Sequence, residues 1–123
     1  MCGGKIMLIT NILTSVIFIV VGAILKLRPP KKINSVYGYR TFFAMKNKET
    51  WKEGNSFSAV MMLIGGSISL SFSLLITLLL REEPNLSSVI SITGSLLITF
   101  SFTLYTEIYL RRIFDEEGIR KTK

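Results

Sequence analysis

The stretch from Pro29 to Asn55 reads PPKKINSVYGYRTFFAMKNKETWKEGN and separates two long apolar segments of the chain. It is rich in aromatic, amide and basic side chains, which the hydrocarbon interior of a membrane does not require. If both flanking segments cross a bilayer, the stretch is held at the membrane surface by its two ends. Its aromatic rings and its arginine suit the headgroup layer, so we take it as the part around which the apolar segments are arranged.

Three apolar segments predict the fold class. They cover residues 6–27, 57–80 and 86–110, and each is 22 to 25 residues long. At about 1.5 Å per residue, each covers the ~30 Å hydrocarbon core. Leu, Ile, Val and Phe lie on all sides of these segments, which argues against a water-soluble bundle with one apolar stripe per helix. We therefore expect an all-α polytopic membrane protein, one membrane domain of 123 residues with a motif loop at 28–56 and a cytoplasmic tail at 111–123.

The placement of the formal charge of +7 predicts the orientation. The connection between the second and third spans holds one basic residue, Arg81, and the stretch from Lys26 to Lys52 holds eight. The eight are Lys26, Arg28, Lys31, Lys32, Arg40, Lys46, Lys48 and Lys52. Because cytoplasmic loops carry an excess of Lys and Arg, we expect the large loop and the carboxyl terminus in the cytoplasm and the amino terminus outside the plasma membrane. The first span lacks a small-residue cleavage pattern, so we expect it to remain as an anchor.

Turn and cap signals place the helix ends. Pro29 and Pro30 end the first helix. Asn47 is a predicted N-cap for a helix that begins at Lys48 and runs into the second span through Gly54, despite a cost of about 1 kcal/mol for glycine. Residues 33–45 mix aromatic and basic side chains and are expected to lie in the membrane interface.

Small and hydroxyl residues mark the packing faces of the spans. Gly65, Ser69 and Ser73 are four residues apart, a spacing that lets two helix backbones approach closely. Ser95 and Thr99 belong to a polar stripe on the third span, and we expect the two stripes to face each other. The partner of the second-span face is left open, either within the chain or in a second copy of it. Pro84 and Asn85 are expected to end the short outer turn.

Catalysis is not expected. The sequence has no His, its single Cys2 cannot form an internal disulfide, and no Gly-rich phosphate loop or metal-ligand cluster is recognisable. We therefore expect no metal, no cofactor and no nucleic-acid partner.

Two charged residues are candidate binding groups. Glu107 lies inside the third span, where ionisable groups are functional candidates, but its spacing to Arg111 favours a structural ion pair. Arg40 is suited to bind a phosphate or carboxylate, with headgroup anchoring as the alternative. Trp51 and Asn55 fall on the packing face of the second helix when it is extended backward, so Asn55 is expected close enough to Arg40 to share a partner.

The ordered set YGYRT, ETW and Asn55 resembles the signature of the SdpI family, including its short YfhL-type members. The matching positions are Asn34, Tyr37, Gly38, Arg40, Thr41, Asn47, Trp51 and Asn55. The resemblance implies a bacterial membrane protein that confers immunity to a secreted, membrane-active peptide toxin. This sequence differs from the larger members of the family, because it lacks the additional spans that precede this unit in them.

Three functions follow as hypotheses. The first is toxin immunity by binding the peptide within the bilayer, on the polar faces of the second and third spans. The second is a membrane-surface module that holds an anionic lipid or a cytoplasmic regulator through Arg40, Lys46 and the aromatic residues. The third is a small subunit of a transporter or enzyme complex.

Overall fold

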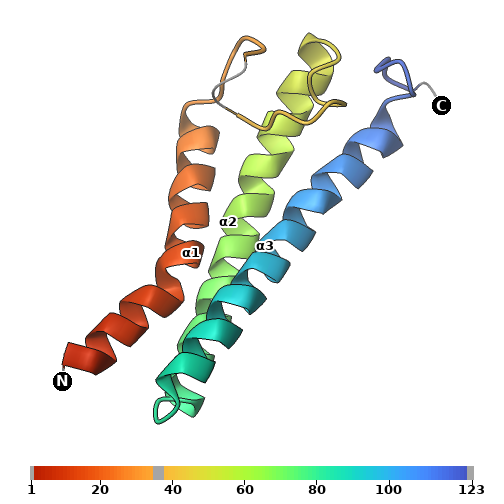
Figure 1. Ribbon diagram of the computed structural model, residues 1–123. Coiled ribbons are helices and arrows are strands. Elements are labelled where there is room, and N and C mark those ends of the chain that lie inside the picture. The colour runs from red at the N-terminus through yellow and green to blue at the C-terminus, as the bar shows by residue number, and fades with distance from the viewer. Residues whose placement is uncertain (1, 35–37, 122–123) are drawn as a thin grey trace.

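Three long helices form the chain, and each is long and apolar enough to cross a membrane. The computed structural model describes residues 2–34 and 38–121, without the side chains of residues 2–4. Helix α1 spans Cys2–Leu27, α2 spans Lys48–Leu79 and α3 spans Pro84–Ile113. They run up, down and up, so that the loop after α1 and the residues after α3 share one end of the bundle (Figure 1). The expected all-α membrane architecture is confirmed.

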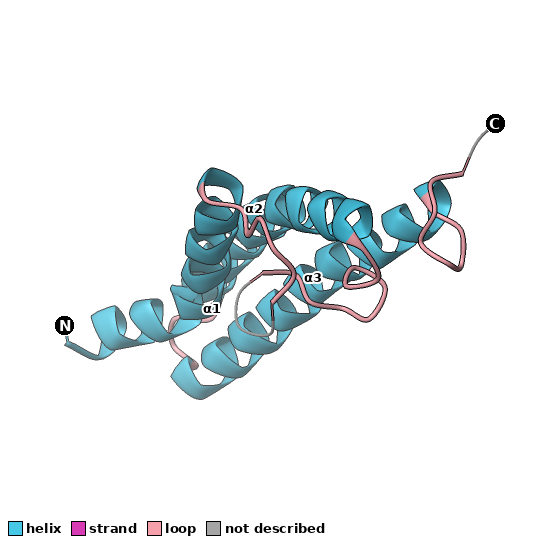
Figure 2. Ribbon diagram, turned by 90° about the horizontal axis from the view of Figure 1, so that it is seen from above, coloured by secondary structure: helices cyan, strands magenta, loops and turns pink. Residues whose placement is uncertain are grey.

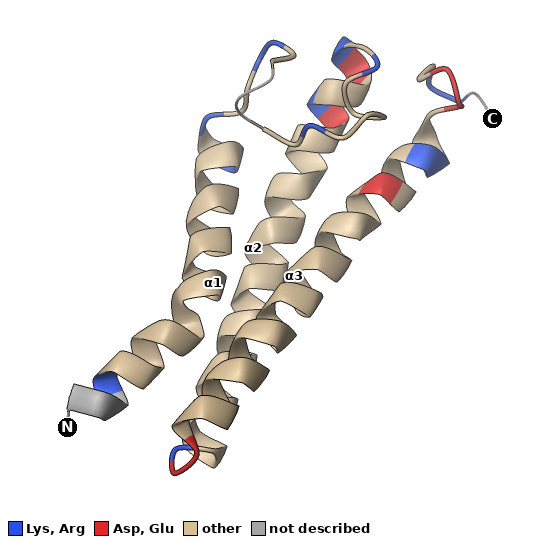
Figure 3. Ribbon diagram, viewed as in Figure 1, with Lys and Arg blue, Asp and Glu red and all other residues tan. Residues whose placement is uncertain are grey.

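Charged side chains mark the two ends of the bundle (Figure 3). The end formed by residues 26–34, 38–53 and 107–121, here called the basic end, holds most of the charged residues, and Lys5 and residues 81–83 lie at the far end. Large apolar side chains such as Ile17, Leu75 and Leu97 are about half exposed between these ends. In a bilayer these side chains contact lipid.

The helix ends follow the predicted caps, with one correction. α2 begins at Lys48 behind Asn47, whose side chain accepts a hydrogen bond from the Thr50 N–H while the Thr50 hydroxyl accepts one from the Asn47 N–H. The expectation that Pro84 ends the outer turn is wrong, because Pro84 is the first residue of α3. Proline suits this position, since the missing N–H has no partner in the first turn of a helix.

Hydroxyl and amide side chains fill the interior of the bundle. Ser73 on α2 and Ser95 on α3 lie 2.8 Å apart, so the polar stripes of the two spans face each other as predicted. The hydroxyl of Ser69 donates to Ser15 of α1 at 3.0 Å. Near the far end, Asn11 donates to Thr77 at 2.8 Å. Because lipid offers no hydrogen-bond partners, each of these contacts favours the assembled bundle.

Two glycines of α2 allow α1 and α3 to pack closely against it. A Cβ on Gly66 would lie 3.2 Å from the backbone nitrogen of Ile19 in α1, and one on Gly65 would lie 3.0 Å from the Cβ of Phe102 in α3. Together with Ser69 and Ser73, these glycines give the small-residue face of α2 its partners within the same chain.

α1 and α3 touch in one half of the bundle and separate in the other. In the far half, Ser88 donates to Asn11 at 2.9 Å and Ser15 lies 3.5 Å from Ser95. At the basic end the two helices lie apart, on either side of α2 (Figure 1). Hydrogen bonds therefore join α1 to α3 in the far half of the bundle, and the two helices are farther apart in its basic half.

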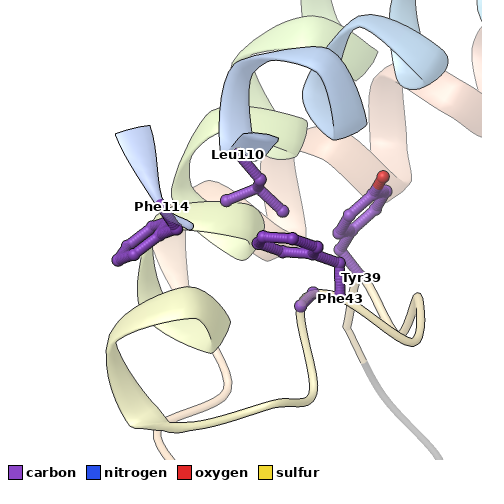
Figure 4. Close-up of a cluster of buried hydrophobic side chains, with 5 residues drawn as sticks. Tyr39, Phe43, Leu110 and Phe114 are labelled. Carbon is purple, nitrogen blue, oxygen red and sulfur yellow. The ribbon is translucent and has the colours of Figure 1, made fainter. Parts of the chain in front are cut away.

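The residues after α3, for which the sequence predicts only a tail, are folded against the bundle. α3 continues to Ile113, and the backbone then turns at Gly118, where φ is +82°, so that the Lys121 N–H bonds the Ile113 carbonyl. Phe114 is 1% exposed and packs in one cluster with Leu110, Phe43 and Tyr39 (Figure 4). Burial of this aromatic ring holds the segment against the bundle.

The hydroxyl interior gives a prediction about packing. Ser73→Leu places a large side chain where Ser95 lies 2.8 Å away, so overpacking should cost about 1–3 kcal/mol and lower the melting temperature in detergent. Ser71→Leu is the matched control, because Ser71 lies on the exposed side of the same helix. Equal melting temperatures for the two variants would contradict the interior placement of Ser73.

Candidate functional site

The loop is fastened to α2 by the side chain of Asn55. Its Oδ1 accepts the Tyr39 N–H at 2.6 Å, and its Nδ2 donates to the Tyr39 carbonyl at 3.4 Å and to the Trp51 carbonyl at 2.9 Å. Asn55 is 1% exposed, so both ends of its amide are committed inside the protein. The Asn55 side-chain amide thus supplies the hydrogen-bond partners for the backbone N–H and C=O of Tyr39.

Trp51 holds the start of the loop in the same way. Its ring is buried, and its Nε1–H donates to the Pro30 carbonyl at 2.8 Å, directly after α1 ends. Trp51 and Asn55 therefore lie on the packing face of α2, against the interfacial segment, as the helical spacing predicts. The helix passes through Gly54 without a break.

Two glycines allow this close approach. Gly38 has a φ of +111°, and a Cβ there would lie 2.5 Å from the Oδ1 of Asn55. Gly54 faces the ring of Tyr39, where an added Cβ would come within 3.3 Å of Cδ2. The motif glycine is thus required by backbone conformation and by the contact with Asn55.

Glu107 connects the loop to α3. Its Oε1 accepts the Tyr39 hydroxyl at 2.7 Å and also accepts the Thr41 hydroxyl. The Arg111 guanidinium is 4.0 Å from the other carboxylate oxygen and is largely exposed. The favoured interpretation of Glu107 as a partner of Arg111 is therefore incomplete, because the shorter contacts bind the loop.

Tyr39 is held as a hydrogen-bond donor. Burial raises the pKa of its phenol far above the usual value, and the neighbouring Glu107 carboxylate raises the pKa further. The phenol therefore keeps its proton at any physiological pH. Thr41 is positioned by a second contact, since its hydroxyl also accepts the Ala44 N–H at 3.2 Å.

A cavity of about 400 Å³ opens beside this hydrogen-bonded cluster. The loop supplies one wall, with the side chains of Arg40 and Thr41, and the helices supply an apolar wall. The lining residues are Val21 and Leu25 of α1, Gly38 to Thr41 of the loop, and Ser58 and Met62 of α2. The cavity thus combines a guanidinium and a hydroxyl at its loop side with aliphatic side chains at its membrane side.

A second cavity of about 390 Å³ lies nearer the middle of the helices. Met62 lines both cavities, and the second is otherwise bounded by Phe18 of α1 and residues of α3. Those of α3 are Leu96, Leu97, Thr99, Phe100 and Thr103. We call the two cavities together the lateral groove, because Met62 lines both and residues of α1 line each of them.

The structure places the predicted residues in several different surroundings. Gly38, Arg40 and Thr41 line the groove, and Trp51, Asn55 and Glu107 position its loop wall. Asn47 caps α2 and donates to the Gly118 carbonyl at 2.7 Å, so it lies away from the groove. Asn34 bonds the Lys32 carbonyl, and Tyr37 lies outside the described residues. Ser69, Ser73 and Ser95 are buried in the bundle, and Thr99 is buried there and also lines the second cavity of the groove.

Some of the site was not predicted. Arg40 and Asn55 line different cavities, because the Asn55 amide is already committed to the loop backbone. Met62 was not singled out, since nothing in an apolar span distinguishes an apolar residue that lines a groove from one that faces lipid. Tyr39 could have been found from its place between Gly38 and Arg40 in the motif.

Glu107→Ala should loosen the loop. The change removes the acceptor of the Tyr39 and Thr41 hydroxyls, which should lower the free energy of loop opening by about 1–3 kcal/mol. The measurement is the rate of tryptic cleavage after Arg40 in detergent. Glu82→Ala, in the exposed turn at the far end, is the control and should leave the rate unchanged. If both variants are cleaved at the rate of the parent protein, the Glu107 contacts do not hold the loop.

Comparison with known proteins agrees with the motif. The model of the SdpI/YfhL protein family matches residues 31–109, which include the loop, α2 and most of α3. The uncharacterized protein YfhL of Bacillus subtilis strain 168 is 35% identical over 94 residues, which cover 76% of this chain and 82% of YfhL. No solved structure matches the chain. With a matching family model over more than half its length, the chain belongs to the SdpI/YfhL family of membrane proteins.

Proposed function

We propose that this chain is a non-catalytic immunity protein that protects a bacterial cell from a secreted, membrane-active peptide by holding the peptide in the lateral groove. Membership of the SdpI/YfhL family supports the class of function. The observation that carries the binding site is the groove itself, with an aliphatic wall and a polar end at Arg40 and Thr41.

The groove suits an amphipathic peptide. Apolar side chains of such a peptide pack against Phe18, Met62 and Phe100, while a carboxylate or backbone carbonyl is bound by the Arg40 guanidinium. Because the groove lies between two membrane helices, the peptide enters sideways from the lipid. Entry through lipid also explains how a peptide that arrives outside the cell reaches a motif at the cytoplasmic end.

The hydroxyl faces of α2 and α3 have a different role in this proposal. Ser69, Ser73 and Ser95 are fully buried, and their hydroxyls bond each other or Ser15. They are therefore occupied in holding the bundle together, and the peptide binds beside them in the groove.

The basic end is proposed to face the cytoplasm. It carries the loop between Lys26 and Lys52 and the folded segment after α3, and the far end holds Arg81 with Glu82 and Glu83. This distribution favours an external amino terminus and a cytoplasmic carboxyl terminus.

Filling the groove should abolish protection. Met62→Trp places an indole between the two cavities, so a toxin-sensitive bacterium that expresses this variant should die at peptide concentrations that the parent protein survives. The measurement is survival over a peptide dilution series, with membrane levels checked by immunoblot. Ile64→Trp is the control, because Ile64 lies on the same helix and is 40% exposed.

The variant pair separates groove binding from general damage. If Met62→Trp and Ile64→Trp protect equally at equal membrane levels, the groove does not bind the peptide. If the parent protein itself gives no survival against any membrane-active peptide, the immunity function is wrong.

The orientation has its own test. In a Cys2→Ser background, Asn85→Cys should react with a membrane-impermeant thiol reagent in intact cells, and Lys46→Cys should react only after permeabilisation. Both positions are exposed in the protein, so burial does not confuse the result. Labelling of position 46 and not of position 85 in intact cells would reverse the orientation.

A further inference from the structure

A separate cavity at the basic end gathers three lysines. It has a volume of about 300 Å³ and lies between the residues that follow α1 and the first turns of α2. Lys31 belongs to the residues that follow α1, and Lys48 and Lys52 lie in the first turns of α2. Lys48 and Lys52 are one helical turn apart, whereas Lys31 is distant from both in the sequence. The fold therefore brings Lys31 to the same cavity as the other two.

Carboxylates do not neutralise this group within the described lining of the cavity. Glu49 and Glu53 lie on the adjacent face of α2, about 100° around the helix from Lys48 and Lys52. There Arg120 contacts both, at 2.7 Å from Glu49 and 3.2 Å from Glu53. The folded segment after α3 thus pairs with the acidic face and leaves the lysine face toward the cavity.

Besides the three lysines, the lining holds Ser56 and two polar side chains that are already hydrogen-bonded within the protein. Trp51 donates its Nε1–H to Pro30, and the amide of Asn55 is used by the backbone of Tyr39 and Trp51. The ammonium groups are therefore the main donors toward a ligand, and an ammonium donates hydrogen bonds but accepts none. A ligand for this cavity must be an acceptor that carries negative charge.

The height of the cavity indicates the source of that charge. α1 leaves its apolar span at Leu27, and Pro29 and Pro30 line the cavity directly after it. This is the level of the lipid headgroups if the apolar segments span the bilayer. We propose that Lys31, Lys48 and Lys52 form a site for the phosphate of an anionic phospholipid, distinct from the lateral groove.

The test compares two charge-matched variants of the full chain in neutral detergent. One carries Lys31→Gln, Lys48→Gln and Lys52→Gln, and the other carries Lys26→Gln, Lys32→Gln and Arg112→Gln, which lie outside the cavity lining. Binding of phosphatidylglycerol is measured by native mass spectrometry. The cavity variant should bind about tenfold or more weakly than the parent protein, and the second variant should bind within about threefold of it.

Two further binding measurements distinguish an anionic lipid from other ligands. Phosphatidylcholine, which carries a phosphate and no net charge, should bind weakly, and inorganic phosphate should not displace phosphatidylglycerol. Equal losses in the two variants would show general charge attraction and overturn the site. Displacement by inorganic phosphate would assign the cavity to a soluble anion and overturn the lipid proposal. If the triple variant does not fold, Lys31→Glu, a single change in the loop, is compared with Lys32→Glu under the same criteria.

Discussion

The pairing of the Asn55 amide with the backbone of Tyr39 is the interaction on which the site depends. A loop between two membrane spans has to satisfy its own N–H and C=O groups wherever it leaves water. Asn55 does this for Tyr39 in both directions, and Trp51 does the same for the carbonyl of Pro30. Once the backbone is fixed at Tyr39, the phenol reaches Glu107 of α3 and the Arg40 side chain lies at the groove. One amide therefore connects α2, the loop and α3.

The interior of the bundle imposes the second constraint. Hydroxyl contacts such as Ser15 to Ser95 hold α1 to α3 in the far half, where small side chains let the helices approach. Nearer the basic end, the larger side chains Phe18 of α1, Met62 of α2 and Phe100 of α3 border the groove. Hydrogen-bonded small side chains thus join α1 to α3 in the far half, and larger side chains line the groove nearer the basic end.

Much of the fold could be predicted from the sequence, and the reasons are local. The prolines after α1 and the cap at Asn47 each act within a few residues, so the end of α1 and the start of α2 could be predicted. The role of Glu107 was misjudged because its contact with Arg111, four residues away in the sequence, is longer than its contacts with Tyr39 and Thr41. Those two residues are more than sixty positions away in the chain. The lining of the groove depends on the crossing of three helices, and that is not encoded in any single segment.

The segment after α3 is highly charged in sequence and nevertheless has a defined fold. Residues 115–117 are all acidic, which is typical of a solvated end, yet Phe114 before them is buried and Gly118 after them turns the backbone. Arg120 then lies over the Phe114 ring at 5.0 Å and pairs with Glu49 and Glu53. These contacts stabilise the first turns of α2, which carry Trp51 and Asn55. The carboxyl end of the chain is therefore part of the support that positions the loop wall of the groove.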